Sequence, residues 1–179
     1  MLPQLISVLN HRIQLSTLTI YKFVKDKDIN YLFYDIGVKS NHNDNWSLTN
    51  IKETIKNDGT LIETINNPSV SSWGLKIPYP SNPYMPIPFC CEFEVIEIHT
   101  NSFANIQLSN TLFSRTFRIG EKGHYKIICN ENGYAAYFNH SISPYVTYSS
   151  EMTSTKVAMV IANDDTSFKY FDFEIYEIQ

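Results

Sequence analysis

The chain has 179 residues, of which 43% are hydrophobic, so it can bury one sizeable core. Its aromatic share of 14% is typical of a β-sandwich, and its formal net charge of −4, without a cluster of Lys or Arg, excludes the basic surface on which most nucleic-acid binding depends. No stretch approaches the ~20 apolar residues of a membrane helix, so neither nucleic acid nor a membrane is expected as a partner.

Residues 1–29 are expected to form an extension that contains an assembly strand. From Ile13 to Phe23, apolar residues alternate with residues that are themselves partly apolar, which predicts a long strand with two partly apolar faces. Such a strand needs a cover on both sides, either in the centre of the sandwich or against a neighbouring subunit. The end of a chain favours the second arrangement, so we expect a homo-oligomer. Residues 30–179 then form the sandwich domain.

The sandwich domain has the pattern of short strands separated by turn signals. Asp58-Gly59 and Asn132-Gly133 each provide a glycine that accepts the positive φ of a tight turn. The prolines between Pro78 and Pro88 predict a surface loop that crosses from one sheet edge to another. In chain order, strands are expected at residues 31–34, between 46 and 57, at 60–65, 73–77, 89–98, 105–108, 112–119, in a hairpin over 123–140, and at 156–161 and 168–178. The sequence thus predicts an all-β, antiparallel two-sheet β-sandwich.

The strand patterns also predict which side chains form the core. The hairpin face with Tyr125, Ile127 and Cys129 should meet Phe93, Val95, Phe171 and Phe173, and Trp73 is expected to be buried with Leu75 and Ile77. The three cysteines are an odd number and two of them are adjacent, so we expect no disulfide. Cys91 and Cys129 are expected to be small core residues. The first residues lack the pattern of a signal peptide, which favours synthesis in a reducing cytoplasm.

The order of these signals resembles a known family. It runs through Tyr-Asp-Ile-Gly from Tyr34, a polar loop that ends at Trp46, the Asp58-Gly59 turn, the Glu-Phe-Glu-Val strand, the hairpin that ends at Asn139-His140, and a final Phe-x-Phe-x-Ile strand. Together, from Asn30 to Gln179, they are similar to the concanavalin A-like, laminin G-like jelly roll. The versions in tail and baseplate proteins of bacterial and archaeal viruses are the most similar. This resemblance implies a virion location after synthesis in the host cytoplasm, with other virion subunits as partners.

The run from Glu92 to Glu97 raises the possibility of catalysis. It is similar to the Glu-x-Asp-x-x-Glu strand of laminarinase-type glycoside hydrolases, and this resemblance implies Glu92 as nucleophile and Glu97 as general acid, with Glu94 in the place of the Asp. Retention needs two carboxyl groups ~5.5 Å apart, which a bulged strand can provide. Nearly the same pattern recurs from Asp172 to Glu177, which instead favours a carboxylate stripe that faces solvent. We therefore expect no enzymatic activity.

Aromatic residues next to polar ones predict a carbohydrate platform. Sugars stack their C–H faces on exposed rings, while Asn, Asp and His side chains bind the hydroxyl groups. Rings of this kind are expected at the proline-rich loop and around the end of the hairpin. The candidate carbohydrate-binding residues are Tyr79, Tyr84, Asn139, His140, Tyr145 and Asp164.

Calcium is the only metal for which the sequence offers ligands. The Asn41–Asn45 loop and the Asp164-Asp165 pair carry the hard oxygen atoms that Ca²⁺ accepts, with Asp44 and Asp165 as candidate ligands. The spacing of a calcium loop is absent, so a turn capped by Asx side chains is the preferred interpretation and no cofactor is expected. The five histidines are scattered without zinc-ligand spacing.

The leading hypothesis is therefore a non-enzymatic, lectin-like module that binds a host cell-surface glycan as part of a virus tail or baseplate. Two alternatives remain, a purely structural virion subunit and a laminarinase-type glycoside hydrolase.

Overall fold

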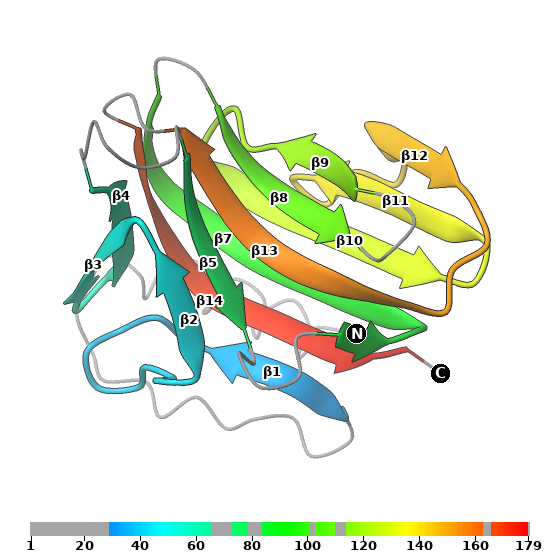
Figure 1. The fold of residues 1–179 in the computed structure, drawn as a ribbon, viewed down its shortest axis with the longest axis horizontal. Coiled ribbons are helices and arrows are strands. Elements are labelled where there is room, and N and C mark those ends of the chain that lie inside the picture. Colours follow the sequence, from blue (N-terminus) through cyan, green and yellow to red (C-terminus); the bar gives the residue numbers. More distant parts are fainter. Residues whose placement is uncertain are drawn as a thin grey trace, which may run out of the picture.

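The computed structural model describes residues 29–65, 73–78, 84–100, 103–109, 114–162 and 166–178. Over these residues the protein is all-β, and its strands form two antiparallel sheets that pack face to face (Figure 1). The predicted β-sandwich is confirmed. The described ranges contain no helix that is long and apolar enough to cross a membrane. The expected assembly strand, at residues 13–23, lies outside the described part of the chain.

The larger sheet carries eight of the described strands. These are β1 (Tyr31–Asp35), β3 (Ile51–Lys56), β4 (Gly59–Thr64), β7 (Phe89–His99), β10 (Gly123–Asn130), β11 (Gly133–Phe138), β12 (Val146–Ser149) and β14 (Ser167–Glu177). Seven of them follow the order β12-β11-β10-β7-β14-β4-β3, and β1 pairs with β14 outside this order. The long strand β14 pairs with β4 over its first half and with β1 over its second half.

The smaller sheet carries six of the described strands, β2 (Trp46–Thr49), β5 (Trp73–Pro78), β6 (Tyr84–Pro86), β8 (Ala104–Ser109), β9 (Ser114–Arg118) and β13 (Ser154–Ala162). Their order is β2-β5-β13-β8-β9, and β6 pairs with the first residues of β13. The short strand β6 corrects part of the prediction that residues 78–88 form a loop outside the sheets. Proline is tolerated there because it lies at a sheet edge, where its missing N–H need not serve a neighbour.

Alternate residues of the central strands fill the core between the two sheets. Tyr125, Ile127 and Cys129 of β10 are buried with Phe93 of β7, as predicted, and the rings of Phe93 and Tyr125 stack with centroids 5.4 Å apart. Cys91 and Cys129 lie in this core, as predicted, and both are free thiols. Cys90 is also buried and free, but its thiol is on the other side of β7, next to Glu92. The two sheets are held together by dispersion contacts and by the removal of apolar surface from solvent.

Phe171 departs from the predicted core because β14 contains a bulge. The register of β14 against β7 shifts between Phe171 and Glu174, and Asp172 has a positive φ of 54°. Phe171 is half-buried as a result, whereas Tyr170 and Phe173 on either side of the bulge are fully buried. A period-two hydrophobic pattern cannot reveal an inserted residue.

The strand β5 faces the opposite way from the prediction. Trp73 is 40% exposed, and the buried residues of this strand are Gly74, Lys76 and Pro78. Lys76 points into the sandwich, where its ammonium group forms a salt bridge with Glu53 of β3 in the other sheet. A hydrophobic pattern assigns a lysine to solvent, and this reversed the expected phase.

The turn of the β10–β11 hairpin depends on Gly133. This glycine pairs with Asn130 across the two-residue turn and has a φ of 131°. A Cβ atom at Gly133 would lie 1.9 Å from the carbonyl oxygen of Tyr148 in β12. We expect Gly133→Ala to lower the free energy of unfolding by roughly 2 kcal/mol or more in urea denaturation. Gly120→Ala is the matched control, because nothing lies within 4 Å of its added Cβ; equal losses for the two variants would contradict the explanation.

Candidate functional site

The alternation of β7 and β10 turns one set of polar side chains to the outer face of the eight-stranded sheet. Phe93 and Tyr125 point into the core, so their neighbours Glu92, His124 and Lys126 point outward. The antiparallel register places Lys126 directly opposite Glu92. Opposite charges on facing residues of one sheet face are a stabilising pair.

Glu92 lies at the centre of a network of hydrogen-bond donors. Its Oε1 accepts from Lys126 Nζ at 2.8 Å, from the Cys90 thiol at 3.3 Å and from the Tyr176 hydroxyl. Its Oε2 lies 3.0 Å from His124 Nε2. Burial acts to raise the pKa of Glu92, but the hydrogen bonds from His124, Lys126 and Tyr176 together outweigh it and hold the pKa well below its ordinary value. Glu92 is therefore a carboxylate at neutral pH.

Three of the donors around Glu92, namely Cys90, Lys126 and Tyr176, have raised pKa values. Burial raises the pKa of the Cys90 thiol to about 12, and burial also raises the pKa of the Tyr176 hydroxyl far above its ordinary value. Burial lowers the pKa of Lys126. The hydrogen bond of Lys126 to Glu92 and its interactions with nearby groups raise this pKa by a larger amount, so the net shift is upward. Cys90 thus acts as a hydrogen-bond donor and lacks the thiolate character of a nucleophile.

A pocket of about 390 Å³ opens beside this network. We call it the Glu92 pocket. It combines a carboxylate, an ammonium group and imidazoles, all of which bind hydroxyl groups, with an aromatic ring and an aliphatic side chain. Its lining residues are Glu92, His124, Lys126, Ile128, Tyr137, His140 and Ser141.

The loop after β11 positions His140 at this pocket. The backbone N–H of Asn139 donates to the carbonyl of His124 at 2.9 Å, and the Asn139 Oδ1 accepts from the N–H of His124 at 3.1 Å. Asn139 and His140 have positive φ values of 49° and 59°, in the region that Asn and His adopt more readily than most residues. The His140 ring stacks on that of His124 with centroids 4.3 Å apart. Asn139 therefore anchors the loop, and His140 lines the pocket.

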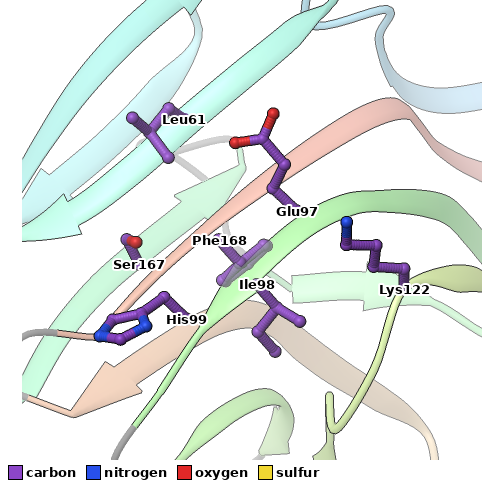
Figure 2. Close-up of a pocket in the computed structure, with 7 residues that line it drawn as sticks. All are labelled: Leu61, Glu97, Ile98, His99, Lys122, Ser167 and Phe168. Atoms are coloured by element: carbon purple, nitrogen blue, oxygen red, sulfur yellow. The ribbon is translucent and has the colours of Figure 1, made fainter.

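Glu97 belongs to a second pocket on the same face, which we call the Glu97 pocket. The register of β7 against β14 skips Ile96, and this bulge returns Glu97 to the outer face, where it pairs with Lys169. Lys169 also contacts Asp58 at 2.8 Å. Figure 2 shows this pocket, with Leu61 and Ser167 on one side of β7 and Lys122 on the other. Its volume is about 250 Å³, and its lining residues are Leu61, Glu97, Ile98, His99, Lys122, Ser167 and Phe168.

The two carboxylates proposed for catalysis do not share a pocket. Glu92 is held by His124 and Lys126 of β10, whereas Glu97 is held by Lys169 of β14, on the other side of β7. A retaining glycosidase places its two carboxyl groups about 5–5.5 Å apart across one bond. The separate pockets of Glu92 and Glu97 differ from that arrangement.

The other predicted site residues lie apart from these pockets or outside the described ranges. Tyr84 is in β6 of the six-stranded sheet, where Lys156 Nζ lies 4.7 Å from the centre of its ring. Tyr145 is 43% exposed just before β12, and it lines neither pocket. Asp44 is exposed in the loop before β2. Tyr79, Asp164 and Asp165 lie outside the described residues.

The Asn41–Asn45 loop is organised by protein groups. The Oδ1 of Asp35 accepts hydrogen bonds from the N–H groups of Gly37 at 2.8 Å and Asn43 at 3.0 Å, and the Oδ1 of Asn43 accepts from the N–H of Asn45 at 3.0 Å. This is the Asx-capped turn that the sequence favours over a calcium site. Over the described ranges, no three His, Cys, Asp or Glu side chains are grouped so that they could hold a metal ion.

Three residues of the outer face were not predicted as site residues, namely His124, Lys126 and Tyr176, whereas Tyr137 is one of the rings expected around the end of the hairpin. The outward direction of His124 and Lys126 follows from their alternation with the core residues of the hairpin. The contacts of His124 and Lys126 with Glu92 depend on the register of β10 against β7. The contact of Tyr176 with Glu92 depends on the register of β14 against β7. The hydrophobic pattern of a single strand does not contain either register.

Comparison with known proteins shows the fold. No family model and no curated protein matches the chain. A Bacillus subtilis protein of unknown function with a galectin-like fold superposes with a TM-score of 0.58 at 7% identity, covering 82% of this chain and 96% of that one. An immunostimulatory antigen and pseudo β-1,3-glucanase of Mycobacterium tuberculosis superposes with a TM-score of 0.55 at 10% identity, covering 84% of this chain and 100% of that one. A β-1,3-glucanase from Mycobacterium marinum superposes with a TM-score of 0.54 at 9% identity, covering 81% of this chain and 98% of that one.

These matches confirm the jelly-roll part of the predicted resemblance. The protein has a β-sandwich fold of the galectin-like and glucanase-like kind. None of the three proteins is named as a virus protein, so the tail and baseplate part of the resemblance stays a prediction.

Proposed function

We propose that this protein is a carbohydrate-binding module whose ligand occupies the Glu92 pocket. The observation that carries the proposal is the composition of that pocket. Sugar hydroxyl groups can donate to Oε2 of Glu92 and accept from Lys126, and the Tyr137 ring offers a surface for the C–H face of the sugar. The shared fold with a galectin-like protein and with proteins named as β-1,3-glucanases supports this ligand class.

Binding without hydrolysis is the form of the proposal that the contacts favour. Both oxygens of Glu92 already accept hydrogen bonds or lie against donors, and a nucleophile would have to give up part of these contacts to reach an anomeric carbon. The separate pockets of Glu92 and Glu97 act in the same direction. The virion location, the host glycan and the virion partners stay predictions of the sequence.

A glycoside hydrolase is the second candidate function. It is favoured by the Glu92-x-Glu94-x-x-Glu97 pattern on one outer face with a bulge at Ile96, and by the β-1,3-glucanase named among the similar structures. We expect no release of reducing sugar from β-1,3-glucan. Release that is abolished by Glu92→Gln and by Glu97→Gln would replace binding by hydrolysis as the function.

Substitution of Tyr137 tests where the ligand binds. We expect Tyr137→Ala to weaken binding of β-1,3-glucan oligosaccharides about tenfold, which corresponds to about 1.4 kcal/mol, because the stacking surface is lost. Tyr137→Phe should keep most of the affinity. Isothermal titration calorimetry measures both, after a glycan array has identified further ligands.

Tyr84→Ala serves as the comparison, since Tyr84 is the predicted aromatic residue of the other sheet. The Glu92 pocket predicts that this variant binds as the unmodified protein does. If Tyr84→Ala abolished binding and Tyr137→Ala left binding unchanged, the carbohydrate platform would instead lie on the six-stranded sheet.

A further inference from the structure

The Glu92 pocket and the Glu97 pocket offer nearly the same chemistry. The Glu92 pocket contains a glutamate of β7 with Lys126 and His124. The Glu97 pocket contains a glutamate of β7 with Lys122 and His99. Each pocket adds aliphatic surface, from Ile128 in the first and Leu61 in the second. Two sites that share a carboxylate, an ammonium group, an imidazole and aliphatic surface suit two copies of the same chemical unit.

Both pockets open on the outer face of the eight-stranded sheet. In the Glu92 pocket, Lys126 and Ile128 alternate with the core residue Ile127. In the Glu97 pocket, Leu61 precedes the core residue Ile62, and Ser167 pairs with His99 on the same side of the ladder. Since successive residues of a strand point to opposite faces, Leu61, Glu97, His99 and Ser167 share the face of the Glu92 pocket, whereas Ile98 and Phe168 contribute from the core side.

One strand connects the two pockets. Glu92 and Glu97 both lie on β7, and at 3.2–3.4 Å per residue with one bulge between them their backbone positions are about 15 Å apart. This separation exceeds the length of a single sugar ring and matches a short oligosaccharide. Glu94 lies between the pockets on the same face and provides a further acceptor for hydroxyl groups.

We propose that the ligand is a glycan chain of repeating units that occupies both pockets at once, across β7. This inference rests on the proposed carbohydrate-binding function and specifies its ligand. When one glycan molecule occupies both pockets, its second contact is intramolecular. The affinity therefore rises with the length of the glycan until both pockets are filled. A single terminal sugar fills only one pocket at a time.

A length series of β-1,3-glucan oligosaccharides tests the proposal. We expect two disaccharides to bind per protein chain but only one hexasaccharide, and we expect the hexasaccharide to bind at least about tenfold more tightly. Native mass spectrometry gives the stoichiometry, and calorimetry gives the affinities. One disaccharide per chain together with no gain in affinity for the hexasaccharide would overturn the two-pocket ligand, while leaving carbohydrate binding intact. If no oligosaccharide of the series binds, the proposed function fails together with this inference.

Lys122→Ala identifies the second pocket in the same experiment. It should remove one of the two disaccharide sites and about tenfold of the hexasaccharide affinity, because Lys122 lines only the Glu97 pocket. Lys156→Ala, on the six-stranded sheet, removes the same charge and should change neither quantity. Hexasaccharide affinity that is unchanged by Lys122→Ala would assign the whole ligand to the Glu92 pocket.

Discussion

Asp35→Ala should lower the free energy of unfolding by about 3–5 kcal/mol, because it removes the charge that holds one end of the sandwich together. The Asp35 carboxylate is fully buried. Its Oδ2 accepts hydrogen bonds from Trp46 Nε1 at 2.8 Å and from the Tyr170 hydroxyl at 2.9 Å, and its Oδ1 accepts from two backbone N–H groups. A buried donor that loses its acceptor costs about 1–3 kcal/mol, and the expected loss of about 3–5 kcal/mol includes this cost.

The surroundings of Asp35 make this loss larger than that of an ordinary hydrogen-bonded residue. His42 lies between two carboxylates. Its Nδ1 is 3.2 Å from Asp35 Oδ1, and its Nε2 is 2.9 Å from Glu53 Oε1. Lys76, whose side chain is fully buried, pairs with Glu53 and lies 4.3 Å from the centre of the Trp46 ring. Burial lowers the pKa of Lys76, and the neighbouring carboxylates, Glu53 first, oppose this shift. Without Asp35, positive charge in the interior is compensated less completely.

Urea denaturation at neutral pH measures the effect. Asp44→Ala is the control, since Asp44 is an exposed acidic residue in the same loop region, and its loss should stay within about 0.5 kcal/mol. Asp35→Asn keeps an acceptor and should fall between the two. A loss of less than about 1 kcal/mol for Asp35→Ala would show that this charge does not organise the fold.

Glu92→Gln should lower the free energy of unfolding by about 2 kcal/mol at neutral pH, because hydrogen bonds to a charged acceptor are among the stronger ones. Lys126, His124 and Tyr176 would then face a neutral amide instead of a carboxylate. The same substitution should weaken glycan binding, since Glu92 lines the pocket.

The pH dependence of the Glu92→Gln effect follows from the lowered pKa. In the folded protein the pKa of Glu92 lies below its ordinary value of 4.5, so at acid pH the unfolded chain binds more protons than the folded one. The stabilisation is therefore complete above about pH 4.5 and is lost as the pH falls toward the folded pKa. The difference between the two proteins should therefore stay constant from neutral pH to about pH 5 and then shrink as the pH falls to about pH 3.

Denaturation curves at several pH values test this sign. Glu94→Gln, on the same strand and face, is the control and should cost less than about 0.5 kcal/mol. A stability difference for Glu92→Gln that is constant from neutral to acid pH would mean that the carboxylate gains no special stabilisation in the folded protein.

Local patterns in the sequence predict most of the strands. The β10–β11 hairpin follows from alternation and from a glycine turn, and the central strand β7 differs from its predicted bounds by one residue at its end. These features depend on residues close in the chain. The core face with Tyr125, Ile127 and Cys129 follows from the same local signal.

The features that the sequence did not reveal depend on contacts between distant residues. Lys76 is buried because Glu53, in the other sheet, offers its carboxylate, and no strand pattern contains that pairing. Phe171 leaves the core because a bulge follows it in β14. For the same reason, Glu92 was recognised as a candidate from its motif, whereas Lys126, which meets it only through the register of β7 and β10, was not.

The most direct test of a carbohydrate site on the eight-stranded sheet is an NMR titration of the ¹⁵N-labelled protein with β-1,3-glucan oligosaccharides. The largest shifts should fall on the amides of β7, β10 and β11 around Glu92, Lys126 and Tyr137. The amide resonances of β6 and β13 should keep their chemical shifts. Shifts concentrated around Tyr84 in β6, with β7 and β10 unchanged, would contradict the assignment of the site to this face.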